Sequence, residues 1–109
     1  MPLNIAQLSK DMLAAAKPAL QNFWTDAKPY AEKETKAFAQ NLAMIEKLRL
    51  LGKISKEAAA LHVEIQKNSF RTVLLTIEGL GILAVEDALN AAIGVIRTTV
   101  NKALGWALL

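Results

Sequence analysis

The sequence contains no cysteine and one histidine, His62. The lack of cysteine excludes disulfides, thiolate metal ligands and a cysteine nucleophile. A single imidazole excludes any metal site that takes two histidines from one chain. The di-metal carboxylate sites of helical bundles use a Glu-x-x-His pattern, and the residue three positions before His62 is Ala59. We therefore expect no bound metal and no cofactor.

Motifs for nucleophilic catalysis and for phosphate binding are also missing. Ser9, Ser55 and Ser69 lie outside any Gly-x-Ser-x-Gly setting, and all would depend on the one histidine as a base. Residues 79–81, Gly-Leu-Gly, lack the further glycine or the Gly-Lys-Ser/Thr that a phosphate-binding loop requires. The sequence therefore predicts a protein without enzymatic activity.

Long apolar runs are absent, although 53% of the residues are hydrophobic and the mean hydropathy is +0.25. The longest stretches without an ionisable residue are 1–9, 37–45 and 88–96, whereas a membrane-spanning helix needs about 20 apolar residues. The first residues also lack the basic region and apolar core of a signal peptide. We expect a cytoplasmic protein without a transmembrane segment.

The net charge of +3 comes from the first half of the chain. Residues 1–53 hold eight Lys/Arg and five Asp/Glu, whereas residues 54–109 hold five of each. The basic residues alternate with acidic ones and form no run. Proteins that bind nucleic acids concentrate Lys and Arg on one face, so we expect no nucleic-acid partner.

Helix-forming residues dominate, and apolar positions recur at steps of three and four, which predicts an all-α chain forming one domain over residues 1–109. Asn4 begins a capping-box pattern, and Pro18 inside that segment is expected to kink or restart the helix. Pro29 follows a second break, and Ser55 suits an N-cap after the turn at Gly52. Residues 79–81 are ambiguous between a turn and a bend. The predicted helical segments lie near 4–26, 29–51, 55–78 and 81–105.

The predicted breaks at Pro29 and at residues 79–81 lie at similar distances on either side of the turn at 52–55. They would therefore be level in a helical hairpin. Two architectures satisfy this spacing. One is a four-helix up-down bundle within a monomer, and the other is a long helical hairpin completed by self-association with a second copy.

The segment 81–105 carries two apolar faces, one of bulky residues and one of small residues. A surface helix in a monomer needs a single apolar stripe, so the second face predicts a homo-oligomer. The alternative is a central helix buried within a monomeric bundle. Ala84, Ala88, Ala91 and Val95 are expected to make close helix contacts, and the main apolar contacts of this interface are expected from Ile82, Leu89, Ile93 and Ile96.

These patterns favour a non-enzymatic interaction or assembly module whose partner is a second copy or another helical protein. The alternative is a peripheral protein of a membrane or lipid surface. In that interpretation Phe23, Trp24 and Trp106 are the interfacial anchors, with Lys17 and Lys28 beside the first two.

Overall fold

The computed structural model describes residues 2–109, and all regular secondary structure in that range is helical. Its elements are α1 (Ile5–Leu20), the 3-10 turn η1 (Gln21–Phe23), α2 (Trp24–Leu50), α3 (Lys56–Leu75) and α4 (Ile82–Leu104). Because no loop separates α1, η1 and α2, the described chain forms three continuous helical stretches, 5–50, 56–75 and 82–104. The all-α prediction is confirmed.

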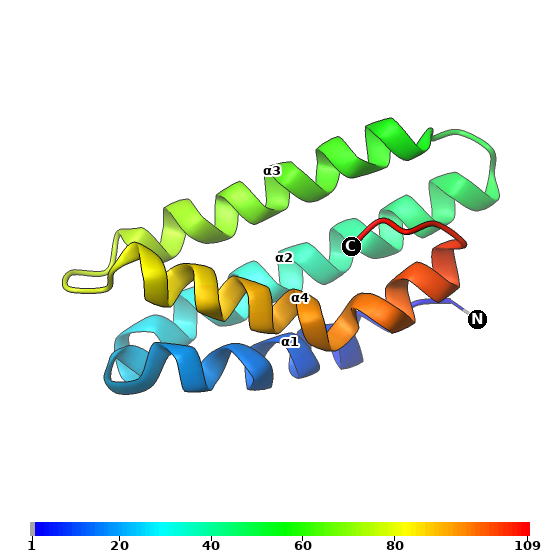
Figure 1. Ribbon diagram of the computed structural model, residues 1–109. Helices are drawn as coiled ribbons and strands as arrows, with labels where there is room; N and C mark the ends of the chain where they lie inside the picture. The colour runs from blue at the N-terminus through cyan, green and yellow to red at the C-terminus, as the bar shows by residue number, and fades with distance from the viewer. Residues whose placement is uncertain (1) are drawn as a thin grey trace.

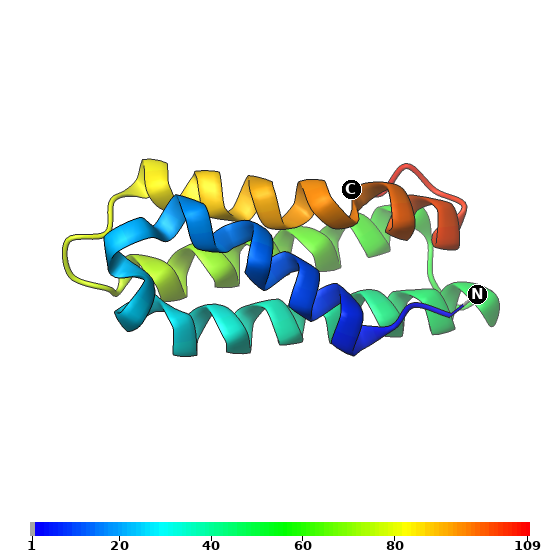
Figure 2. The same cartoon turned by 90° about the horizontal axis from the view of Figure 1, so that it is seen from below.

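The helices lie side by side in an elongated body of 44 × 22 × 19 Å (Figures 1 and 2). α1 packs against α4 more extensively than any other pair of helices, followed by α1 with α2 and α2 with α3. α3 and α4 share a smaller contact. The α2–α3 connection lies at one end of the body, and η1 and the α3–α4 connection lie at the other (Figure 1).

Two side chains cap helices as the sequence predicts. The Asn4 side chain accepts a hydrogen bond from the amide of Gln7 at 3.0 Å, and Ser55 Oγ accepts one from the amide of Ala58 at 3.1 Å. Each bond satisfies an amide that has no partner within its helix. These caps fix the starts of α1 and α3.

The first bend lies at η1, close to the kink or restart predicted at Pro18, and not at the second predicted break between residues 26 and 29. Pro29 lies inside α2. Because proline has no backbone N–H, one carbonyl near the start of the helix lacks its usual hydrogen-bond donor. The chain instead bends where α1 ends, two residues after Pro18. Gln21 there has φ 44°, in the region that side chains with a Cβ rarely adopt. The predicted inner boundaries at 26 and 29 were therefore wrong, whereas the outer ones at 4 and 51 agree with the helix ends to within one residue.

Replacing Gln21 with glycine is expected to stabilise the protein. Glycine adopts positive φ without the steric cost that Gln21 bears, which raises the free energy of unfolding. Part of this increase is lost, because glycine also makes the unfolded chain more flexible. The expected net increase in the free energy of unfolding is about 1 kcal/mol, or about 4–8 °C in Tm. Thermal unfolding followed by circular dichroism measures it. Gly52→Ala is the opposite control, because Gly52 has φ 67° and open space for a Cβ, so its Tm should fall.

Residues 79–81 form a turn and not a bend within one helix. α3 ends at Leu75 and α4 begins at Ile82, so the predicted boundaries near 78 and 81 shift by at most three residues. Gly79 has φ 87°, and a Cβ there would lie 3.1 Å from the ring of Phe23. The turn thus packs closely on η1 at this end of the body.

The core receives side chains from every helix. Its largest fully buried side chains include Met12, Leu20, Phe38, Leu42, Ile45, Phe70, Leu74, Leu89 and Ile96. α3 has four buried residues among 20, a smaller share than in α1, α2 or α4, and most of their volume belongs to Phe70 and Leu74. A small number of large side chains therefore attaches α3 to the rest of the molecule.

Candidate interaction surfaces

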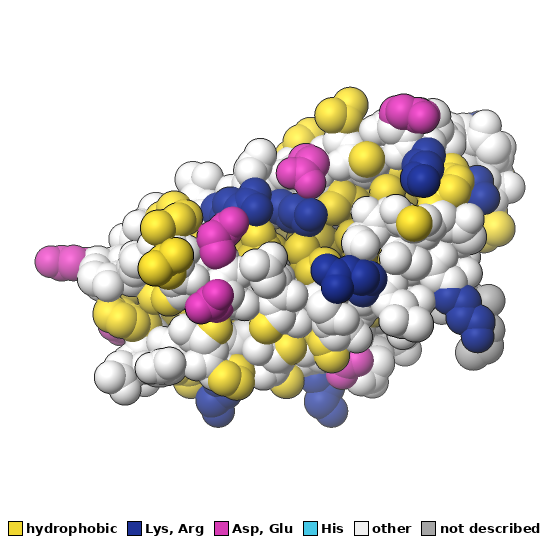
Figure 3. Space-filling model, in the orientation of Figure 1, with side chains coloured by type: hydrophobic (Ala, Val, Ile, Leu, Met, Phe, Trp, Pro, Cys, Tyr) yellow, Lys and Arg dark blue, Asp and Glu magenta, His cyan; other side chains and the backbone are white. Residues whose placement is uncertain are grey.

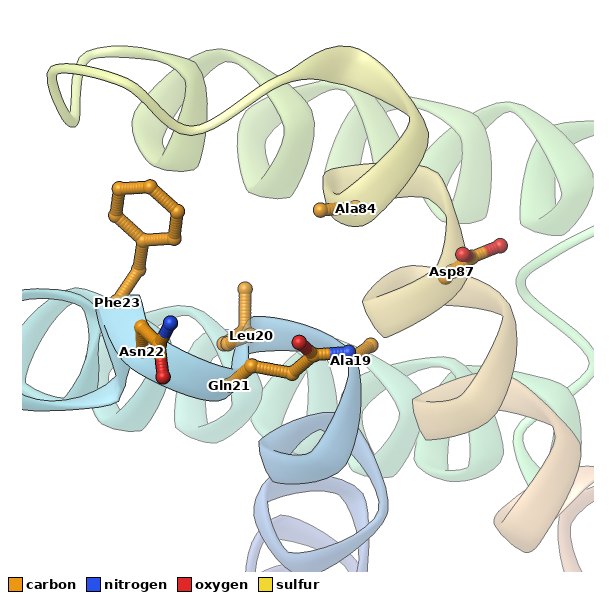
Figure 4. A pocket seen from close by; sticks show the side chains of 7 residues that line it. All are labelled: Ala19, Leu20, Gln21, Asn22, Phe23, Ala84 and Asp87. Carbon is orange, nitrogen blue, oxygen red and sulfur yellow. The ribbon is translucent and has the colours of Figure 1, made fainter.

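The small-residue strip of α4 faces α1 of the same chain. Ala84 lines a hollow of about 240 Å³ together with Ala19 and Leu20 of α1, and its methyl group is directed toward that space (Figure 4). Ala88, one turn further along, is completely buried, and Ala91 is partly buried. The close helix approach that these alanines allow is therefore made within the chain.

The other α4 residues predicted for the interface, which are the bulky ones and Val95 of the small-residue strip, divide into a buried group and an exposed group. Leu89, Ile93 and Ile96 are buried in the core, whereas Ile82 and Val95 are half-exposed. This corrects the assignment of Ala88, Leu89, Ile93 and Ile96 to a contact between copies, because the chain's own helices already cover them. An intermolecular contact through Ile82 and Val95 stays a prediction.

The three proposed aromatic anchors do not come together. Phe23 and Trp24 lie where α1 meets α2, and Trp106 follows α4 at the other end. All three are partly buried against the core. Trp24 has the ammonium of Lys17 5.4 Å from its ring, and the guanidinium of Arg49 lies 3.9 Å from the Trp106 ring. These contacts give both tryptophans a structural role.

The ionisable side chains make pairs and not a reactive cluster. Across the part of the chain that the structure describes, no group of three or more His, Asp or Glu is placed to hold a metal ion. Arg71 of α3 donates to Glu86 of α4 at 2.7 Å, and this hydrogen bond raises the pKa of the Arg71 guanidinium. Ser69 donates to the largely buried Glu34 at 2.7 Å, joining α3 to α2.

The polar residues near the end of α4 hold the last residues of the chain against it. The Asn101 side chain accepts hydrogen bonds from the amides of Leu108 and Leu109 at 2.9 and 2.8 Å. Arg97 donates to the Leu109 carbonyl at 3.2 Å, and Arg49 of α2 donates to the Leu104 carbonyl. The structure thus uses these groups to fold residues 105–109 back over the bundle.

A first exposed apolar surface runs along the outside of the α2–α3 pair. Leu61 and Ile65 are 66% and 60% exposed, and they lie on the side of α3 opposite its buried residues Ala59 and Val63. Met44 of α2 is also exposed. Sequence analysis missed this surface, although the position of Leu61 between two residues of the buried face was a usable signal.

Met44 and Leu61 lie at similar heights on neighbouring helices. The hydrogen bond between Glu34 and Ser69 fixes the register of the antiparallel pair. Met44 follows Glu34 by ten residues, and Ala59 precedes Ser69 by ten, so equal rise per residue brings Met44 level with the start of the Leu61 turn. We call Met44, Leu61 and Ile65, with the exposed Tyr30 near the end of α3, the outer face.

A second exposed apolar surface is the tip formed by the α2–α3 connection. Leu50 is 82% exposed and Leu51 is 57% exposed, beside the exposed Lys53 and Lys56. Residues 47–56 contain four basic residues and no acidic one. Sequence analysis overlooked this group because apolar residues separate its charges, and the turn then gathers them. We call Leu50, Leu51, Lys53 and Lys56 the hairpin tip.

No protein family model, curated protein or solved structure matches the chain. Over residues 2–109, no helix combines the length and the hydropathy that crossing a membrane requires.

Proposed function

We propose that this protein is a non-enzymatic self-associating assembly module and that its outer face is the interface between two copies. In this proposal each chain forms an up-down bundle of helices, and the α2–α3 pairs of two copies pack on one another. The observation that carries the proposal is the exposed apolar row of Tyr30, Met44, Leu61 and Ile65.

The apolar character of this row supports a protein contact. Single exposed hydrophobic residues are normal on a protein surface, but apolar side chains gathered on one face mark interaction sites. Leu61 and Ile65 are one helical turn apart, and Met44 lies level with the same part of α3. Covering them removes apolar area from water, which favours association by about 25 cal/mol for each Å² buried.

The charges beside the outer face support a second copy as the partner. Over residues 33–50 of α2 the exposed charged side chains are Lys33, Lys36 and Lys47, all basic, whereas over residues 57–75 of α3 they are Glu57 and Glu64, both acidic. A two-fold axis parallel to the helices places α2 of one copy over α3 of the other. The basic side chains of α2 in each copy then face the acidic side chains of α3 in the other copy, and symmetry makes this contact twice. Opposite charges favour this arrangement over one that brings like charges together.

The variant Leu61→Glu/Ile65→Glu is expected to be monomeric. It places two carboxylates in each half of a symmetric contact, and loss of one central contact residue commonly costs about 2 kcal/mol or more, so we expect at least a thirtyfold weaker dimer. Sedimentation equilibrium of the wild type and the variant measures the change. Melting curves test whether the monomer remains folded, as expected for two exposed positions.

Ile82→Glu/Leu83→Glu is the matched control, because it adds the same charges at exposed positions of α4. Dissociation of this control with no effect of the α3 variant would transfer the interface to α4. A wild-type chain that sediments as a monomer at high micromolar concentration would overturn self-association altogether.

A further inference from the structure

We propose that the hairpin tip binds membrane surfaces rich in anionic phospholipids, with Leu50 and Leu51 entering the interfacial region and Lys53 and Lys56 contacting the headgroups. This site is separate from the outer face, and the inference does not depend on self-association. It also differs from an anchor built on Phe23, Trp24 and Trp106, which pack against the core.

The two leucines of the hairpin tip are exposed to solvent. Leu50 is the most exposed large hydrophobic residue of the described chain, and Leu51 follows it at the start of the turn. Both lie at one extreme of the long axis, at the α2–α3 connection (Figure 1). A surface that meets this end therefore reaches the two leucines before the rest of the body, which is the geometry that shallow insertion requires.

The hairpin tip is also positively charged. Basic residues supply all the ionised side chains of residues 47–56, whereas the opposite end carries Asp26 and Glu78 beside one hollow and Asp87 beside another. In Figure 3 an acidic side chain protrudes from the left-hand end, and Lys and Arg side chains spread over the middle and the right-hand part, where one acidic side chain is also visible at the top. Lys17 and Lys28 also lie near the other end and offset most of its acidic charge. An anionic surface thus attracts the tip more strongly than the other end, which orients the molecule.

The size and shape of the tip favour a lipid surface over a folded protein. The body has a cross-section of 22 × 19 Å, which covers roughly half of the about 800 Å² per partner that a standard protein interface buries. A lipid surface needs no such area, because a few apolar side chains and nearby basic charges contribute independently. Arg49 is held by Trp106 and the Leu104 carbonyl, so the exposed lysines are the groups free to meet headgroups.

Co-sedimentation with sucrose-loaded vesicles tests the site. The wild type is expected to bind vesicles of phosphatidylglycerol and phosphatidylcholine, to bind pure phosphatidylcholine far less, and to dissociate as salt is raised. Lys53→Gln/Lys56→Gln should weaken binding by about fivefold per lysine, the equivalent of about 1 kcal/mol per charge at an anionic surface. Lys10→Gln/Lys28→Gln is the control of equal charge at exposed positions outside the hairpin tip and the outer face, and it should retain most of the affinity.

Insertion is tested by a fluorophore, because a chain without cysteine can be labelled at one introduced thiol. A nitrobenzoxadiazole label on Leu51→Cys should brighten and shift to the blue with anionic vesicles. The same label on Leu83→Cys, which is 79% exposed at the other end, should not change. Leu50→Ser/Leu51→Ser should lower the partition coefficient at least about tenfold and leave the sedimentation of the free protein unchanged.

Three results would overturn the proposal. One is a wild type that does not bind anionic vesicles. Another is binding that the tip variants do not weaken. The third is equal binding to duplex DNA and to vesicles with no effect of Leu50→Ser/Leu51→Ser, which would make the tip a general site for polyanions. None of them bears on the dimer, whose test contains no lipid.

Discussion

Replacing Ala88 with glutamate is expected to prevent folding. Ala88 is fully buried on the side of α4 that α1 covers, in the most extensive helix contact of the molecule. A larger side chain in a packed contact costs about 1–3 kcal/mol, and burying a carboxylate without a partner costs several kcal/mol more. Domains of this size are stable by about 5–15 kcal/mol, so the variant should lose most or all of its folded population.

Circular dichroism and thermal melting measure this loss directly. The control is Asn90→Glu, two residues along the same helix at an exposed position, which should change the free energy of unfolding by less than about 0.5 kcal/mol. An Ala88→Glu protein that melts like the wild type would show that α1 does not cover this part of α4. A variant that folds normally and differs from the wild type only in oligomeric state would instead assign Ala88 to an interface between copies.

Replacing Phe70 with alanine is expected to destabilise the protein by about 3–5 kcal/mol, as for other fully buried aromatic residues. Phe70 is completely buried, and with Leu74 it forms most of the apolar attachment of α3. α3 also has a smaller contact with α4 than with α2. The loss should therefore appear first in α3, as local opening ahead of the other helices.

Urea unfolding measures the total loss, and hydrogen exchange resolved by residue locates it. The matched control is Leu61→Ala on the same helix, which should cost little because Leu61 is 66% exposed. Uniform acceleration of exchange in all helices would contradict the local attachment of α3. A cost below about 1 kcal/mol would contradict the burial of Phe70 itself.

The sequence predicts those features of the fold that depend on neighbouring residues. The caps at Asn4 and Ser55 are local hydrogen bonds between a side chain and an amide three residues on, so they are legible in the sequence. Pro18 predicts a kink or restart near the observed bend, but its exact position at Gln21 is not legible, because nothing in that side chain favours φ 44°. Pro29 gave the strongest local signal for a break, but a proline near the start of a helix is tolerated.

The surfaces were harder to predict than the helices. The two apolar faces of α4 were legible in the sequence, but which molecule covers each face depends on which helices pair. α1 supplies that cover from a position far away in the chain. The outer face and the hairpin tip were missed for a related reason. An exposed leucine such as Leu61 or Leu50 has the same letter as a buried one, and exposure depends on the packing of the whole chain.

The extensive contact between α1 and α4 also constrains how the chain reaches its native state during synthesis. α1 is synthesised before the other helices of this chain and α4 after them, so the apolar side of α1 lacks its α4 contact while α2, α3 and the turn at 79–81 are made. A nascent chain without α4 leaves buried residues of α1, such as Leu20, without the cover that α4 supplies. Folding is therefore a late event for this protein, and a growing chain has an interval in which other apolar surfaces, including those of chaperones, compete for α1.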